Sequence, residues 1–257
     1  MESIRSKDGT TIAFDRTGHG LALVMVMGAF CNRFSTTDLA GAMDAGFTVY
    51  AYDRRGRGDS GDTGEYAIER EVDDLAAITA VAAEAGDVPF VYGHSSGAAL
   101  ALEAASRGVA MQKLAVYEPP YTDDDGPTSS FADELRELVA AGRRNEAAER
   151  FLTLTGAPVE MIEQIKASAY WPNMQALAHT LPYDIALCNG GSAPVERFAR
   201  IDVPTLALAG RASPTWAAEA ARVIASVVPG GKYRVLDGQD HNVADEAIAS
   251  VLTDFFV

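Results

Sequence analysis

The feature that most constrains this chain is a Gly-x-Ser-x-Gly pentapeptide between a predicted strand and a predicted helix. The apolar run 90–92 leads into residues 93–97, and an Ala/Leu-rich segment typical of a helix follows. A serine at the apex of such a tight turn holds its hydroxyl above the sheet, and the flanking glycines avoid collisions with neighbouring backbone. We therefore predict that Ser95 is a nucleophile rather than part of a turn without chemistry.

Around this turn, short apolar runs alternate with segments of helical periodicity. The runs span residues 21–27, 47–52, 88–92, 114–117, 204–209 and 233–236. Continuous apolar strands that alternate with helices predict an α/β fold, with a mostly parallel central sheet and helices on both faces. The first strands are an exception, because Asp8-Gly9 separates two β-rich runs within residues 2–16 and predicts an antiparallel hairpin.

The alternation stops between Pro119 and about Pro194, where helical periodicity dominates. We therefore predict two parts. Residues 1–121 and 195–257 form a core, and residues 122–194 form a helical insertion that caps it. A chain of 257 residues is long enough to bury such a core without a metal or disulfides.

Charge and cysteine content restrict the partners of the chain. The formal net charge is −15, from 21 Lys and Arg against 36 Asp and Glu, which would repel nucleic acids and anionic membranes. Part of this charge lies in residues 123–125, where we expect it to disfavour anionic substrates. Cys31 and Cys188 show neither a disulfide framework nor metal-ligand spacing, and no run suits an export signal or a membrane span. These observations predict a cytoplasmic protein without a metal site. The turn at 93–97 carries Ser95 rather than a phosphate-binding Gly-x-Gly-x-x-Gly loop, so we also expect no cofactor and a small-molecule substrate.

With these motifs in order, nearly the whole chain resembles the α/β-hydrolase superfamily, in its serine-nucleophile branch. Residues 28–30 after a strand resemble the oxyanion loop of that family, although Met27 replaces the usual histidine. The resemblance implies that the backbone amides of Ala29 and Ser96 hold the oxyanion. Residues 53–61 resemble a family loop that braces the nucleophile turn.

A serine hydroxyl needs a general base, and a histidine needs a carboxylate to orient it. His241 follows the last predicted strand, where the family keeps its base. The usual Asp after strand 204–209 is missing, and Ser213 stands in its place, so either the acid has moved or the triad is incomplete. Glu118 ends the predicted strand 114–117, a position that haloalkane dehalogenases and some related hydrolases use. We predict Glu118 as the acid, with Asp237 as the fallback.

The pocket is the least constrained part of the prediction. We expect the substrate to contact apolar and aromatic residues of the insertion and of the two catalytic loops, namely Phe30, His94, Tyr170, Trp171 and Met174. An apolar pocket favours a small or medium hydrophobic ester, lactone or thioester, cleaved through an acyl-enzyme. A carbon–carbon bond hydrolase, lyase or cyclase on the same scaffold is the alternative. A non-catalytic ligand-binding member is a second alternative, suggested by Ser213 and Met27.

Overall fold

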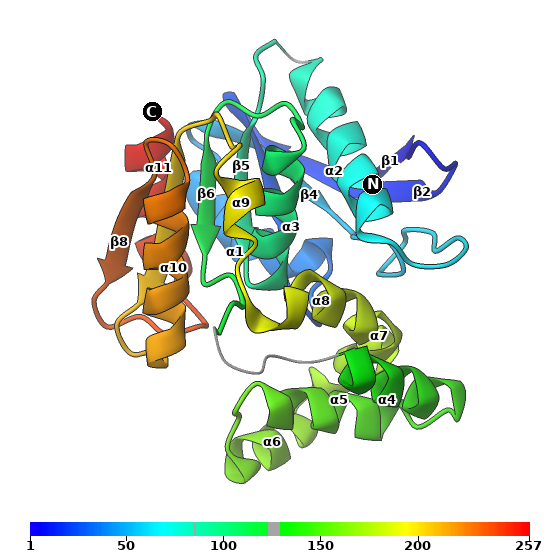
Figure 1. Cartoon of the computed structure of the whole chain (residues 1–257). Coiled ribbons are helices and arrows are strands. Elements are labelled where there is room, and N and C mark those ends of the chain that lie inside the picture. The colour runs from blue at the N-terminus through cyan, green and yellow to red at the C-terminus, as the bar shows by residue number, and fades with distance from the viewer. Residues whose placement is uncertain (85, 123–128) are drawn as a thin grey trace.

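A computed structural model describes residues 1–84, 86–122 and 129–257, and these residues form one eight-stranded sheet (Figure 1). The strand order is β1-β2-β4-β3-β5-β6-β7-β8. The strands are β1 Glu2–Arg5, β2 Thr11–Gly18, β3 Leu21–Val26, β4 Phe47–Tyr52, β5 Phe90–His94, β6 Leu114–Tyr117, β7 Thr205–Gly210 and β8 Lys232–Leu236. β2 pairs antiparallel with β1 and β4, and every pairing from β4 to β8 is parallel. The predicted hairpin and the mostly parallel α/β sheet are confirmed.

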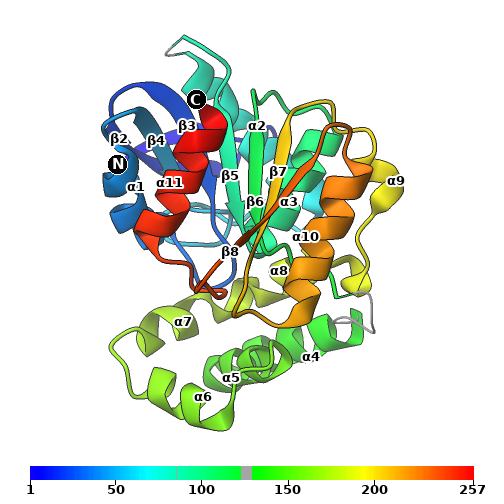
Figure 2. The same ribbon diagram turned by 90° about the vertical axis from the view of Figure 1, so that its left-hand side faces the viewer.

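Helices cover both faces of the sheet (Figures 1 and 2). One face packs against α2 Ile68–Ala83, α3 Ser96–Ser106, α9 Val195–Phe198 and α10 Thr215–Val227. The other packs against α1 Thr37–Met43 and α11 Asp245–Phe256. Side chains of a strand alternate between faces, so Val24 and Val26 lie in the first apolar layer, whereas Leu23 and Met25 lie in the second.

The carboxyl ends of the central strands lie at one edge of the sheet. Residue His94 of β5 pairs with Tyr117 of β6, and Tyr117 pairs with Leu208 of β7. β5 therefore runs two residues beyond the apolar run 88–92, because backbone pairing with β6 continues where the side chains are no longer apolar. Residues that follow β5 and β6 consequently emerge side by side.

A group of helices between β6 and β7 lies across this carboxyl edge (Figure 2). These insertion helices are α4 Ser129–Ala140, α5 Arg144–Leu154, α6 Val159–Lys166, α7 Trp171–Leu177 and α8 Leu181–Leu187. Among the described residues, short 3-10 turns occur in the insertion at Ala178–Thr180 and Asn189–Gly191, and in the core at Arg33–Thr36. The insertion helices share an apolar core, here called the insertion cluster, which also contains Phe30.

The acidic run 123–125 that we expected to disfavour anionic substrates lies outside the described residues. α9, which directly follows the predicted insertion, packs against α3 and α10 of the core. No helix in the described part of the chain is long and apolar enough to cross a membrane.

Candidate active site

The predicted nucleophile sits at the junction between β5 and α3. Ser95 has φ 57° and ψ −127°, and its backbone N–H donates to the Tyr117 carbonyl at 2.9 Å. A Cβ at Gly97 would lie 2.1 Å from the Val26 carbonyl oxygen, so the turn can approach β3 only with glycine at that position. Ser95 is partly exposed, and its hydroxyl makes no hydrogen bond to the described residues.

Backbone strain marks the same region independently. Four described residues other than glycine have a positive φ, and three of them are Phe30, Ser95 and Glu118, at 60°, 57° and 47°. Such conformations cost on the order of 1–3 kcal/mol each and persist where the surroundings impose them. Their concentration at the carboxyl edge of β3, β5 and β6 points to a functional site there.

Glu118 connects the end of β6 to the loop that follows β8. Its side chain is completely buried, and its Oε2 lies 2.7 Å from Nδ1 of His241. Its other oxygen, Oε1, accepts hydrogen bonds from the Gly210 backbone N–H at 2.7 Å and from the Ser213 hydroxyl at 2.6 Å. His241 keeps 41% of its side chain exposed, so its ring is held on one side and open on the other.

The hydrogen bonds on Glu118 decide its charge. Burial raises the pKa of this carboxyl, but the hydrogen bonds from His241, Ser213 and Gly210 outweigh burial and leave the pKa below its ordinary value. Glu118 is therefore ionised at neutral pH. Sequence reasoning noted Ser213 only as the residue that replaces an acid, and it missed this hydrogen bond because the partner lies 95 positions away.

The other two acids near His241 are engaged elsewhere. Asp237 pairs with Arg211 on the surface, and its side chain is 82% exposed. Asp240 accepts a hydrogen bond from the Asn242 backbone N–H at 2.8 Å. Among the described residues, Glu118 is thus the carboxylate that hydrogen-bonds the His241 ring.

The backbone of the His241 loop is held at three consecutive carbonyls. The Gln239 carbonyl accepts from the Ala212 backbone N–H at 2.9 Å, and the Asp240 carbonyl accepts from the Tyr117 hydroxyl at 2.6 Å. The His241 carbonyl lies 2.9 Å from His94 Nε2. Because a carbonyl can only accept, His94 Nε2 must carry the proton of this hydrogen bond.

His94 is a partly buried, neutral group rather than a second base. Burial, followed by the nearby His241, lowers the pKa of His94 to about 4. Its ring stacks on Tyr117 with centroids 5.6 Å apart and an interplanar angle of 7°. In the described structure its Nδ1 is buried without a hydrogen-bond partner. His94 therefore supports the His241 loop, and its predicted contact with substrate stays a prediction.

The predicted oxyanion segment forms a tight turn, here called the 28–31 turn, beside Ser95. The Cys31 backbone N–H lies 3.4 Å from the Gly28 carbonyl, and a Cβ at Gly28 would lie 2.8 Å from the Ser95 Cβ. Arg57 Nη1 also donates to the Gly28 carbonyl. Ala29, whose amide we predicted as a donor, is partly exposed within this turn.

A buried ionic network lies behind the nucleophile turn and was not predicted. Arg54 donates to Glu71 at 2.7 and 2.8 Å and to Asp184 at 2.8 Å, while Arg57 donates to both Asp184 oxygens at 2.7 and 3.0 Å. The Ser96 hydroxyl donates to Asp184 Oδ1 at 2.6 Å. Burial raises the pKa of Asp184, but Arg57 and Arg54 outweigh it and hold the pKa below its ordinary value. The network joins α8 to the segment 53–61, which we had expected to brace this turn.

Four of the residues predicted for the pocket, Phe30, Tyr170, Trp171 and Met174, lie in or beside the insertion cluster. Phe30, Trp171 and Met174 are buried members of that cluster. The Trp171 indole N–H donates to Asn145 at 2.7 Å. Tyr170 is 45% exposed and donates its hydroxyl to the Phe30 carbonyl at 2.6 Å.

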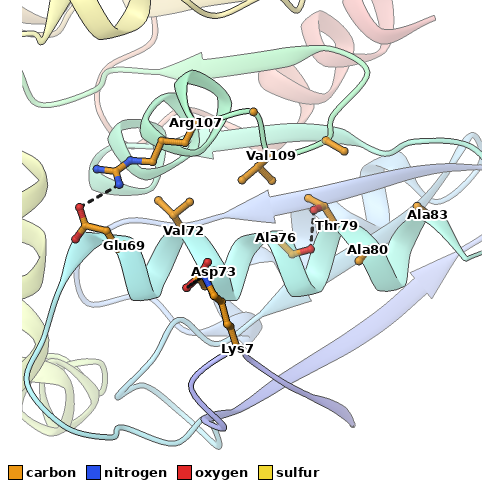
Figure 3. Close-up of a pocket in the computed structure, with 12 residues that line it drawn as sticks. Lys7, Glu69, Val72, Asp73, Ala76, Thr79, Ala80, Ala83, Arg107 and Val109 are labelled. Atoms are coloured by element: carbon orange, nitrogen blue, oxygen red, sulfur yellow. Dashed lines mark hydrogen bonds and ion pairs between the residues drawn. The ribbon is translucent and has the colours of Figure 1, made fainter.

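A surface pocket of about 550 Å³ occurs elsewhere, between α2 and the segment that follows α3 (Figure 3). Its charged groups are paired, Arg107 with Glu69 at 3.0 Å and Lys7 with Asp73 at 3.6 Å. Ser95, Glu118 and His241 do not line it. Within residues 1–84, 86–122 and 129–257, no group of three or more His, Cys, Asp or Glu residues could hold a metal ion.

Comparisons with known proteins show the family and the fold of the chain. A family model described as "Alpha/beta hydrolase family" matches residues 19–251. The crystal structure of an alpha/beta hydrolase from Sphaerobacter thermophilus is 45% identical, with a TM-score of 0.94 over 100% of both chains. A non-heme chloroperoxidase from Kitasatospora aureofaciens is 26% identical over 95% of this chain and 93% of its own. An enol-lactonase from Burkholderia xenovorans is 19% identical over 99% of both chains, and its TM-score of 0.74 shows a shared fold.

Proposed function

Because the chain belongs to the alpha/beta hydrolase family, we propose that it is a serine hydrolase with Ser95, His241 and Glu118 as its catalytic triad. The observation that carries this proposal is the 2.7 Å hydrogen bond between His241 Nδ1 and a fully buried, ionised Glu118. A carboxylate in this position keeps a proton on Nδ1, which leaves Nε2 as a lone-pair acceptor. His241 is therefore prepared to remove a proton from Ser95.

In the first half of the reaction, Ser95 Oγ attacks the carbonyl carbon of the substrate while His241 Nε2 takes the hydroxyl proton. The negative charge moves to the carbonyl oxygen, which the backbone amides of Ala29 and Ser96 stabilise. When the intermediate collapses, the imidazolium returns the proton to the leaving oxygen or sulfur, and an acyl-enzyme remains on Ser95. The hydrogen bond between Ser95 and His241 forms with substrate, as is common for catalytic pairs that are loose in the free enzyme.

In the second half, water takes the place of the leaving group. His241 Nε2 removes a proton from the water, whose oxygen attacks the acyl carbonyl, and the proton then passes to Ser95 Oγ as the acid is released. Glu118 stays ionised throughout and stabilises each imidazolium that forms. The reaction needs no group besides the protein and water.

We further propose that the substrate is a small or medium hydrophobic ester, lactone or thioester, and that the insertion helices form a cap over it. The apolar insertion cluster beside the 28–31 turn supports an apolar acyl group. Relatives described as a hydrolase and an enol-lactonase are consistent with acyl transfer.

The decisive experiment compares p-nitrophenyl acetate and butyrate turnover, and fluorophosphonate labelling, in the parent and in Ser95→Ala. We expect the variant to lose turnover and labelling, because the nucleophile is gone. Ser226→Ala is the matched control, since the Ser226 hydroxyl bonds the Val223 carbonyl on the surface helix α10. Turnover that survives Ser95→Ala would reject the assignment.

The same experiment separates the alternatives. Labelling of Ser95 without ester turnover would favour a carbon–carbon bond hydrolase, lyase or cyclase. The absence of both in the parent would favour a non-catalytic binding protein. Ser213 no longer favours the non-catalytic alternative, because its hydroxyl donates to Glu118 instead of marking a lost acid.

A further inference from the structure

The 28–31 turn is attached to the insertion through one backbone carbonyl. The Phe30 carbonyl accepts a hydrogen bond from the Tyr170 hydroxyl at 2.6 Å and a second from the Asn173 side-chain amide at 3.2 Å. Tyr170 immediately precedes α7, and Asn173 belongs to it. The insertion helix α7 therefore holds a piece of the core that adjoins the nucleophile.

The side chain of Phe30 is held by the insertion as well. Its ring packs edge-on against Phe151 of α5, with centroids 5.4 Å apart, and it is a buried member of the insertion cluster. Its φ of 60° lies in a region that bulky side chains rarely adopt. Because such a conformation persists only where its surroundings impose it, these contacts with α5 and α7 maintain the shape of the turn.

The turn contains the Ala29 amide, whose direction depends on these attachments. The carbonyl of the Gly28–Ala29 peptide is held by Arg57, which is itself held by Asp184 of α8. A trans peptide is planar, so its N–H points opposite to its carbonyl, and holding the Gly28 oxygen directs the Ala29 N–H away from Arg57. Tyr170 and Asn173 hold the next residue along the chain. The Ala29 peptide is thus held on both sides by contacts that lead to the insertion helices.

We infer that the insertion, besides covering the substrate, sets the direction of the Ala29 amide, and that Tyr170 and Asn173 are positioning residues for the oxyanion. This inference rests on the proposed serine hydrolase function. It also changes the role expected for Tyr170, from a residue that selects the acyl chain to one that acts equally on every substrate.

The test compares two tyrosines that each link the insertion to the core. Tyr170→Phe removes the hydroxyl from the Phe30 carbonyl, whereas Tyr183→Phe removes a hydroxyl that bonds Asp62 at 2.8 Å, away from the 28–31 turn. We expect Tyr170→Phe to lower kcat about tenfold on p-nitrophenyl acetate, butyrate and hexanoate alike, because the donor is misplaced rather than lost. KM stays within twofold, and Tyr183→Phe keeps kcat within twofold.

The inhibition constant of a tetrahedral transition-state analogue distinguishes a positioning role from a purely structural one, because a structural role would leave that constant unchanged. A trifluoromethyl ketone forms an oxyanion on Ser95, so its inhibition constant for Tyr170→Phe should rise by the same factor by which kcat falls. Asn173→Ala is a second variant with the same expected pattern, and it serves if Tyr170→Phe does not fold. The double variant should lose at least as much kcat as either single variant, because both side chains donate to the same carbonyl oxygen.

Other outcomes would overturn the inference. Unchanged kcat and inhibition in both variants, or a loss that appears in KM and varies with chain length, would make Tyr170 a pocket residue only. An equal loss in Tyr183→Phe would mean that general docking of the insertion, and not the Phe30 carbonyl, is responsible. If the parent shows neither turnover nor labelling, the proposed serine hydrolase function is wrong. If the parent is active and Tyr170→Phe is equally active, only the positioning role of Tyr170 is wrong.

Discussion

Two buried carboxylates, Glu118 at the end of β6 and Asp184 on α8, differ in the partners that compensate their charge. Burial raises the pKa of each, yet each ends below its ordinary value. Asp184 achieves this with Arg54 and Arg57, which are cations at any pH of interest. Glu118 relies on His241 and on two neutral donors. The comparison teaches that a buried charge alone does not indicate catalysis, whereas a buried charge beside a group that changes its own protonation does.

The sharpest way to break this comparison is Glu118→Gln, for which we expect kcat to fall about 10³- to 10⁴-fold. The Gly210 N–H and the Ser213 hydroxyl both donate to Oε1, so they keep the amide oxygen of a glutamine on their side. The glutamine NH₂ then faces His241 Nδ1, which must accept, and the proton moves to Nε2. A histidine with that tautomer cannot take the Ser95 proton.

Steady-state kinetics on p-nitrophenyl butyrate measure this effect, with a thermal melt to verify the fold. Glu219→Gln on the exposed face of α10 is the matched control and should be silent. A loss of only a few-fold in Glu118→Gln would remove Glu118 from the triad.

The corresponding change in the other region, Asp184→Asn, should act mainly on stability. It leaves Arg54 and Arg57 as buried cations with one carboxylate fewer, which costs about 3–5 kcal/mol. We expect the melting temperature to fall by about 10 °C. Because Asp184 holds Arg57, which bonds the Gly28 carbonyl, kcat should also fall about tenfold, far less than in Glu118→Gln. Calorimetry and kinetics on the same preparation decide the point. A variant that melts like the parent and loses activity as Glu118→Gln does would contradict the distinction.

The pH dependence of stability gives a smaller and independent test. Because folding lowers the pKa of Asp184, its ionisation stabilises the native state above its ordinary pKa of 3.8, and this contribution disappears as pH falls through the lower folded value. The difference in unfolding free energy between the parent and Asp184→Asn should be constant above about pH 5 and shrink below about pH 4. Urea titrations across this range measure it. A difference that grows on acidification would mean that the pKa is raised.

The smallest expected effects come from removing one hydroxyl in each region. Ser213→Ala removes a 2.6 Å hydrogen bond to Glu118, so the pKa of Glu118 rises and kcat/KM falls about tenfold, most at acid pH. Tyr66→Phe removes a 2.8 Å hydrogen bond to Glu71 in the ionic network, and it should lower the melting temperature by a few degrees without changing kcat/KM. Thermal melts and pH–rate profiles of Ser213→Ala and Tyr66→Phe test this difference. It would be contradicted if both variants changed only kcat/KM or only the melting temperature.

Local pattern was sufficient to predict much of the fold and the nucleophile turn, whereas the base and the acid were predicted from the resemblance to the α/β-hydrolase family. Apolar runs located the strands, and Glu118 lies at the carboxyl end of the parallel strand β6, as the run 114–117 predicted. His241, predicted as the base from that resemblance, lies in the loop that follows β8, which ends at Leu236.

The remaining features depend on how distant segments dock. The bond between Ser213 and Glu118 exists because β7 lies beside β6, and the pairs made by Asp184 exist because α8 packs behind the nucleophile turn. Periodicity shows that α8 is a helix but not which core residues its carboxylate meets. For the same reason the sequence could not separate a pocket role for Tyr170 from its hydrogen bond to the Phe30 carbonyl.

The three carbonyl contacts of the His241 loop bear on how this protein can be varied. His94 and Tyr117 hold main-chain oxygens of residues 240 and 241, so the loop depends on the side chain at position 240 only for the bond that Asp240 accepts from the Asn242 backbone N–H. A library randomised at position 240 should retain folded, active members and offers a place to alter the rim of the site. Randomising Tyr117 or His94 would instead disturb the loop from beneath, so tolerance to mutation in this loop follows the backbone contacts rather than distance from Ser95.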